Sequence, residues 1–224
     1  MSFEAVVFDM DGVLVDSEPL HYATTNAVLG RRGAQLGPAD YDGLRGLTDV
    51  ALFERLAARF GLRERAEALA AERVGAVLIR MAEEPLLPTD GALECLVWLK
   101  ADGLRLALAS SATRAQVDLV VDRLGIRRLL ETTVSAGDAA RGKPHPDLFL
   151  KAAERLRVAP GACLVVEDAV LGVVAAAAAG MEAVALVPEG QPDAEHREAG
   201  AVASIRSLRE LTPEAVLRWS ARKR

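Results

Sequence analysis

The chain has 224 residues, 51% of them hydrophobic and 4% aromatic, and its formal net charge is −5. These values suit one folded domain, or a core domain with a smaller insert, and they argue against extensive disorder. The mild acidity and the lack of a long internal basic run argue against a nucleic-acid-binding surface, and no apolar stretch is long and unbroken enough to span a bilayer. We therefore expect a cytoplasmic protein that has neither a nucleic acid nor a membrane as its partner.

The first expected element is a buried strand over residues 3–8, a short apolar run that ends at the turn Asp9-Met10-Asp11-Gly12. Residues 17–86 then show helical patterns throughout, with helices expected over 17–29, 48–60 and 63–82. We find no convincing strand in this stretch, which indicates a separate helical lobe.

Beyond Pro88 helical and strand patterns alternate along the chain. Helices are expected over 90–100, 113–124, 146–156, 170–179 and 213–218, and strands over 104–109, 132–135, 163–166, 183–187 and 201–203. Alternation of this kind indicates βαβ units and a parallel sheet. Six strands are too few for an eight-stranded barrel, so the expected fold class is α/β, with a Rossmann-like, doubly wound sheet. The expected domains are an α/β catalytic core of residues 1–16 and 87–224 and a helical domain of residues 17–86.

Polar groups follow four of the expected strands, at the edge where doubly wound sheets bind ligands. In chain order they are Asp9 and Asp11, then Ser110 and Ser111, then Asp138, Arg141 and Lys143, and finally Glu167 and Asp168. Each of them alone could be structural, because Asp and Ser are common in turns and helix N-caps and a single lysine usually lies in a solvated loop. Their occurrence at four strand ends favours a functional site.

The residue types at these strand ends suit phosphate chemistry. Carboxylates from two strands favour a hard divalent cation such as Mg²⁺, and the absence of nearby histidine or cysteine argues against zinc or iron. A lysine and a serine supply donors for phosphate oxygens. Asp9, directly on a strand end, suits a nucleophile that forms an aspartyl-phosphate, and Asp11 suits a general acid and base. That role requires Asp11 to be protonated part of the time near neutral pH, so its pKa should be raised.

The run Asp9-Met10-Asp11-Gly12-Val13-Leu14-Val15-Asp16-Ser17 resembles the first signature of the haloacid dehalogenase superfamily. Ser110, Lys143 and the pair Glu167-Asp168 resemble its second, third and fourth motifs, in family order. The resemblance implies Asp9 as nucleophile and Asp11 as acid and base, with phosphate bound by Ser110, Ser111 and Lys143. It also implies Mg²⁺ held by Asp9, the Asp11 backbone carbonyl and Asp168, with Glu167 at the metal directly or through water. The helical insert stands where members of the superfamily carry a cap domain.

Within the superfamily, Asp11 favours a phosphatase or phosphomutase over a dehalogenase. His21, Arg45 and Gly46 resemble substrate-binding cap residues of the β-phosphoglucomutase-like and sugar-phosphate phosphatase group. However, Asp49 and Thr113 stand where the mutase carries the cations that bind a second phosphate. We therefore expect a monomeric, magnesium-dependent phosphatase that hydrolyses a small phosphate monoester, a sugar phosphate. The alternative is a hexose-phosphate mutase.

Overall fold

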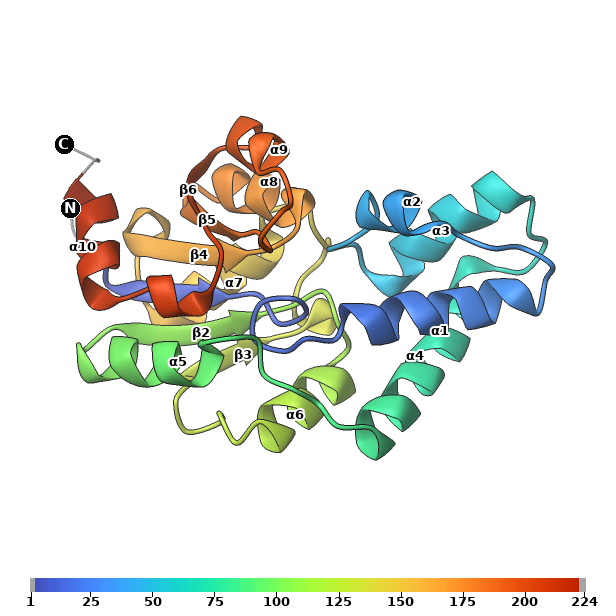
Figure 1. The fold of residues 1–224 in the computed structure, drawn as a ribbon, viewed down its shortest axis with the longest axis horizontal. Coiled ribbons are helices and arrows are strands. Elements are labelled where there is room, and N and C mark those ends of the chain that lie inside the picture. Colours follow the sequence, from blue (N-terminus) through green and yellow to red (C-terminus); the bar gives the residue numbers. More distant parts are fainter. Residues whose placement is uncertain (1–2, 222–224) are drawn as a thin grey trace.

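A six-stranded parallel sheet forms the centre of the computed structural model, which describes residues 3–221 (Figure 1). The strands are β1 (Ala5–Phe8), β2 (Arg105–Ala109), β3 (Thr132–Val134), β4 (Cys163–Glu167), β5 (Glu182–Leu186) and β6 (Ala201–Ile205). Their order across the sheet is β3-β2-β1-β4-β5-β6, so the chain winds outward from β1 first in one direction and then in the other. This topology confirms the expected Rossmann-like fold and places its switch point at β1.

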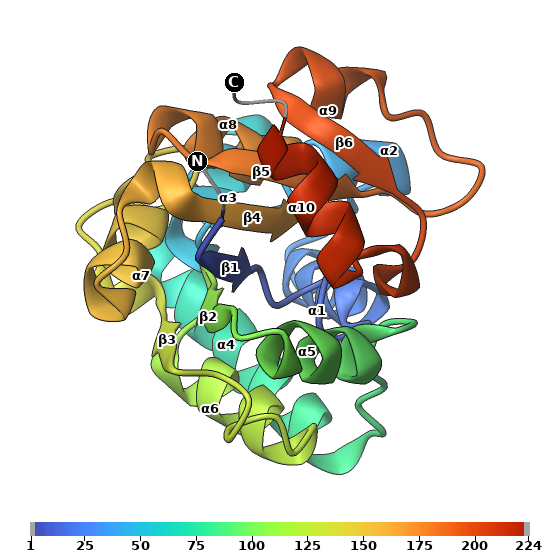
Figure 2. The ribbon, with the colours of Figure 1, turned by 90° about the vertical axis from the view of Figure 1, so that its left-hand side faces the viewer.

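Helices cover both faces of the sheet because successive strand residues point to opposite sides. One face, with Val6 and Phe8, packs against α5 (Ala92–Ala101), α6 (Arg114–Arg123) and α10 (Pro213–Ala221). The other face, with Ala5 and Val7, packs against α7 (Asp147–Leu156) and α8 (Val170–Ala178). Figure 2 shows these two helical layers on either side of the strands. The short helix α9 (Ala194–Glu198) precedes β6 at the edge of the sheet.

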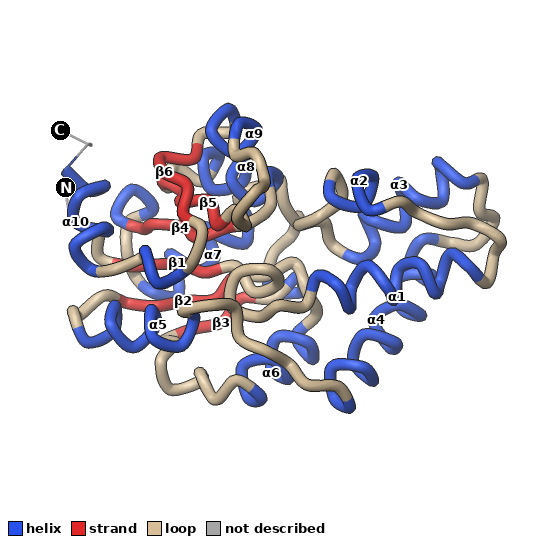
Figure 3. Tube along the Cα trace, viewed as in Figure 1, coloured by secondary structure: helices blue, strands red, loops and turns tan. Residues whose placement is uncertain are grey.

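Four helices lie between β1 and α5 and form a lobe beyond one end of the sheet (Figure 3). They are α1 (Glu18–Gly30), α2 (Pro38–Asp42), α3 (Asp49–Phe60) and α4 (Ala66–Glu83). The lobe has its own apolar cluster, which includes Leu29, Phe53, Leu56 and Leu69. The two chain segments that join it to the core lie side by side, because Val15 pairs with Pro88 and the Asp16 N–H donates to the Leu87 carbonyl at 3.0 Å.

The sequence pattern missed two short helices, α2 and α9, of five residues each. Pro38 occupies the first turn of α2, where the N–H that proline lacks would have no partner within the helix. Helices this short also show too few turns for a periodic pattern to indicate them. The expected bounds of the other helices and strands differ from the observed ones by three residues or fewer. Within residues 3–221, no helix has the length and hydropathy that crossing a membrane requires.

Candidate active site

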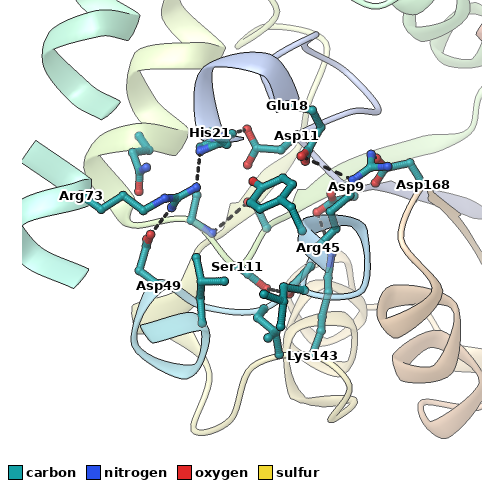
Figure 4. A pocket seen from close by; sticks show the side chains of 18 residues that line it. Asp9, Asp11, Glu18, His21, Arg45, Asp49, Arg73, Ser111, Lys143 and Asp168 are labelled. Atoms are coloured by element: carbon teal, nitrogen blue, oxygen red, sulfur yellow. Dashed lines mark hydrogen bonds and ion pairs between the residues drawn. The ribbon is translucent and has the colours of Figure 1, made fainter. Parts of the chain in front are cut away.

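The carboxyl ends of the strands meet the helical lobe at one pocket, shown in Figure 4. The core contributes Asp9, Asp11, Ser110, Ser111, Lys143 and Asp168. The lobe contributes Glu18, His21, Arg45, Gly46, Asp49 and Arg73. Of the site residues that the resemblance implied, only Glu167 does not line the pocket, because it is fully buried beside Lys143 and Asp9. The position of Asp9 follows from the topology, since β1 is the central strand at the switch point.

Lys143 connects the two acidic strand ends. Its ammonium group donates to Asp9 Oδ1 at 2.6 Å and also to Glu167 Oε1, and the side chain is 1% exposed. Burial alone would lower the pKa of Lys143, but the charges of Asp9 and Glu167 outweigh it and raise that pKa. The lysine is therefore held as a cation beside Asp9, where it can bind an anion.

Asp9, Glu167 and Asp168 form a buried acidic cluster whose ligand atoms all lie within 4.8 Å of one another. Burial, reinforced by the neighbouring carboxylates, raises the pKa of Asp9 to about 8 and that of Asp168 well above its usual value. Three carboxyl groups thus lie beside two cations, Lys143 and Arg45, and a hard divalent cation, which would favour the ionised carboxylates, suits this set of oxygen donors. Gly12 permits this approach, because its φ is +76° and a Cβ there would overlap the Asp168 carboxylate.

The hydrogen bonds of Glu167 indicate whether its carboxylate is free to bind a metal ion directly. Its Oε1 accepts from Lys143, and its Oε2 accepts from the backbone N–H groups of Asp168 and Ala169 at 3.1 and 3.2 Å. Both oxygens are thus engaged in orienting Lys143 and the loop after β4. Asp9 and Asp168 are the members of the cluster better placed to give an oxygen directly to a cation.

Asp11 points toward the lobe, away from the acidic cluster. Its Oδ1 accepts from Ser17 Oγ at 2.5 Å and lies 2.8 Å from His21 Nε2. Burial would raise the pKa of Asp11, but His21, Ser17 and Arg73 outweigh it and lower that pKa. The expected upward shift is therefore wrong for this arrangement, because the donors of the lobe stabilise the carboxylate form.

His21 is oriented by Arg73, a buried arginine of α4 that the sequence analysis missed. Arg73 Nη2 lies 2.9 Å from His21 Nδ1, and an arginine can only donate, so Nδ1 accepts and Nε2 carries the proton donated to Asp11. A signal for Arg73 was present in the sequence. It lies at helical spacing with Leu69 and Val77 on the buried face of α4, where an unpaired charge would be costly.

Two contacts from the segment before α3 reach the core. Arg45 Nη2 donates to Asp168 Oδ2, and its Nε lies 3.4 Å from Glu18 Oε2. Ser111 Oγ donates to the carbonyl oxygen of Gly46 at 2.8 Å, and the φ of +82° at Gly46 favours glycine there. Arg45 thus contacts the acidic cluster, and Gly46 contacts the segment after β2.

The segment after β2 adds a second residue that the sequence analysis missed, Gln116. The Thr113 N–H donates to Gln116 Oε1 at 2.9 Å, and this bond fixes the orientation of the side-chain amide. The amide nitrogen is buried without a partner in residues 3–221, and the side chain lines the pocket. Ser110 Oγ, nearby, accepts from the Ala112 N–H at 3.0 Å.

The remaining polar groups of the strand ends serve structure. Asp138 binds Arg114 and Arg155, and Arg141 binds Asp147 at 2.9 Å. Arg114, which follows the position of the missing mutase cation, therefore points to Asp138 rather than into the pocket.

Fold and site together define the class of the protein: an α/β protein with a buried acidic site between a Rossmann-like core and a helical insert. The family model of the haloacid dehalogenase-like hydrolases matches residues 3–180, and the chain belongs to that family.

Named relatives agree with this assignment. The chain is 33% identical over 215 residues to a phosphorylated carbohydrates phosphatase of Thermotoga maritima, covering 96% of each chain. It is 30% identical over 219 residues to a β-phosphoglucomutase of Bacillus subtilis, covering 94% of this chain and 92% of the relative. The fold matches the crystal structure of a Clostridium difficile β-phosphoglucomutase with a TM-score of 0.87 at 23% identity, covering 99% of this chain and 98% of the other.

Proposed function

We propose that this protein is a magnesium-dependent phosphatase that hydrolyses a small phosphate monoester, a sugar phosphate, through an aspartyl-phosphate on Asp9. The observation that carries the proposal is the placement of Asp9 at the end of β1, with Lys143 Nζ at 2.6 Å from its carboxylate. Asp11 lies on the other side, turned toward the lobe. This arrangement supplies a nucleophile, a cation for the phosphate and a separate proton carrier.

The reaction proceeds in two steps. Asp9 attacks phosphorus, the bond from phosphorus to the ester oxygen breaks, and the leaving oxygen takes a proton from Asp11. Water then attacks the aspartyl-phosphate, Asp11 takes its proton, and Asp9 and inorganic phosphate are released. The lowered pKa of Asp11, which favours its carboxylate form, suits the second step. For the first step we infer that the negative charge of the bound phosphate raises the pKa of Asp11.

Mg²⁺ would be held by Asp9, Asp168 and the Asp11 backbone carbonyl, and when bound it would supply positive charge for the phosphate oxygens. Residues 17–86 act as a cap over the core, which consists of residues 1–16 and 87–224. Ser110, Ser111 and Lys143 bind the phosphate, and His21, Arg45 and Gly46 bring the cap to it. The close set of carboxyl oxygens in the acidic cluster and the contacts of Arg45 and Ser111 across the pocket support these assignments.

The test is phosphate release from a panel of sugar and polyol phosphates, with and without Mg²⁺, by the wild type and by Asp9→Asn. We expect Mg²⁺-dependent release by the wild type and a loss of at least about 1000-fold in Asp9→Asn. Asp102→Asn, an exposed change at the far end of the core, should behave as the wild type. Absence of release from every ester would refute the phosphatase, and appreciable activity in Asp9→Asn would refute the nucleophile.

A hexose-phosphate mutase is the second candidate, favoured by the relative of that name in Bacillus subtilis. The same assay separates the two functions. A mutase would need a bisphosphate sugar for turnover and would accumulate an isomer of the substrate, whereas a phosphatase accumulates inorganic phosphate.

A further inference from the structure

An ion pair lies in the lobe half of the pocket, between the first residue of α3 and the middle of α4. Asp49 Oδ1 accepts from Arg73 Nη1, and the two side chains are 11% and 7% exposed. Both line the pocket. Removing one partner of an ion pair this deeply buried is costly, because it leaves an uncompensated charge.

Every nitrogen of the Arg73 guanidinium has a partner. Nε donates to Thr25 Oγ1 at 2.8 Å, Nη2 to His21 Nδ1 at 2.9 Å, and Nη1 to Asp49. Arg73 is therefore held in one orientation and neutralised by Asp49. Three of its five N–H groups are engaged and its charge is compensated, so Arg73 offers little net attraction to an anionic ligand.

The pair faces the part of the pocket remote from the nucleophile. Arg73 and Asp49 lie on one side of the pocket in Figure 4 and Asp168 on the other, and His21 stands between Arg73 and Asp11. A substrate whose phosphate lies at Asp9 and Lys143 would thus extend its remaining atoms toward Asp49. Leu44, Leu47 and Leu52 also line the pocket and add no charge.

Asp49 also has an oxygen to offer a ligand. Its Oδ2 takes no hydrogen bond from residues 3–221, whereas Oδ1 is bound to Arg73. A carboxylate oxygen accepts hydrogen bonds from hydroxyl groups and repels other anions, since like charges brought together at a binding interface cost several kcal/mol.

From these contacts we infer that the Asp49–Arg73 pair is a specificity determinant. It selects phosphate monoesters whose remainder carries hydroxyl groups, and it rejects those with a second anionic group. The inference rests on the proposed function and extends it. It names the two residues of the cap that recognise the part of the substrate other than its phosphate.

The test compares two ligands with the same open six-carbon chain, sorbitol 6-phosphate and 6-phosphogluconate, which differ by a hydroxyl or a carboxylate at the end remote from the phosphate. Each is measured as a substrate and as a competitive inhibitor of p-nitrophenyl phosphate hydrolysis, in the presence of Mg²⁺. The wild type should bind the neutral-ended ligand at least about tenfold more tightly, and Asp49→Asn should reduce that ratio to within about threefold.

The matched control is Asp40→Asn, which removes the same charge from an Asp–Arg pair on the surface of the same lobe, where Asp40 lies 2.7 Å from Arg59. It should leave the ratio unchanged. If Asp49→Asn does not fold, Asp49→Ser keeps an acceptor for Arg73 without the charge and replaces it in the test.

Two results would overturn the inference: an equal effect of Asp49→Asn on both ligands, or the same change of ratio in Asp40→Asn. Either could occur while the wild type still releases phosphate, in which case the proposed function stands and the specificity role fails. If the wild type releases phosphate from none of the esters, the proposed function fails first.

Discussion

Gln116 presents a buried amide nitrogen to the pocket, and such a donor without an acceptor costs about 1–3 kcal/mol. A bound substrate oxygen would satisfy it. We predict that Gln116→Glu raises KM for phosphate monoesters by about tenfold, because the donor is replaced by a carboxylate. The local helix cap should be kept, since glutamate can still accept the Thr113 N–H in the capping box at the start of α6.

Steady-state kinetics with sugar phosphates and thermal melting of both proteins check this prediction. A lower melting temperature together with an unchanged KM would mean that Gln116 only caps the helix. The opposite pattern, a raised KM with an unchanged melting temperature, would show that the Gln116 amide donates a hydrogen bond to the bound substrate.

Asp138 joins three elements, since it accepts hydrogen bonds from Ser135 after β3, from Arg114 of α6 and from Arg155 of α7. Burial alone would raise the pKa of Asp138, but these donors, led by Arg155, outweigh it and hold the pKa well below its usual range. A carboxylate with a depressed pKa in the folded state stabilises the fold above its unfolded pKa, about 3.9, and this contribution is lost as the pH falls through the folded pKa.

We therefore predict that the free energy of unfolding of the wild type falls more steeply between about pH 4 and pH 2 than that of Asp138→Asn, which has no carboxyl group to titrate. Urea denaturation at a series of pH values measures both slopes. Asp102→Asn serves as the control and should follow the wild type. Equal slopes in the wild type and Asp138→Asn would show that the three donors do not act through the charge of this carboxylate.

At the scale of the whole molecule, the contact of Gly142 with Thr48 limits how closely the lobe can approach the core. A Cβ on Gly142 would lie 2.5 Å from Thr48 Cγ2. We predict that Gly142→Ala holds the lobe away from the site and lowers kcat/KM by about tenfold or more, since displacements near 1 Å can have effects of this size.

The double variant Gly142→Ala, Thr48→Ser should recover activity, because serine lacks the Cγ2 methyl and keeps the hydroxyl that accepts from the Ala51 N–H at the start of α3. Gly137→Ala, in the same loop with no atom within 4 Å of its Cβ, is the neutral control. If kcat/KM of the double variant stays low, the loss of activity arises from a change in the loop around Gly142 and not from the distance between lobe and core.

The core half of the site could be predicted from sequence because parallel strands end at one edge of a sheet. Asp9, Ser110, Lys143 and Asp168 needed only the strand positions to be brought together. The lobe half could not be predicted in the same way. Arg73 meets His21 only through the packing of α4 on α1, and the downward pKa shift of Asp11 depends on the donors that this packing supplies.

The fold was predicted well for the same reason, since its long helices and alternating strands carry strong periodic patterns. The features that the sequence pattern did not predict are small: two five-residue helices and the orientation of the Gln116 amide. Such details are set by neighbours that are distant in the chain or by a single hydrogen bond, and neither repeats along the sequence.

The central position of β1 has a consequence for how the chain acquires its structure. Ala5 pairs with Arg105 on one side and with Cys163 on the other, so both neighbours of this strand are made long after it. Pairings so distant in sequence form slowly, and a strand with two open edges is a template for aggregation until they are covered. We therefore expect the lobe, whose contacts are local, to fold first during synthesis. The strand that ends at Asp9 can pair with β2 once residue 109 has emerged, but its other edge stays open until residue 167 has emerged, and chains interrupted before that point should aggregate.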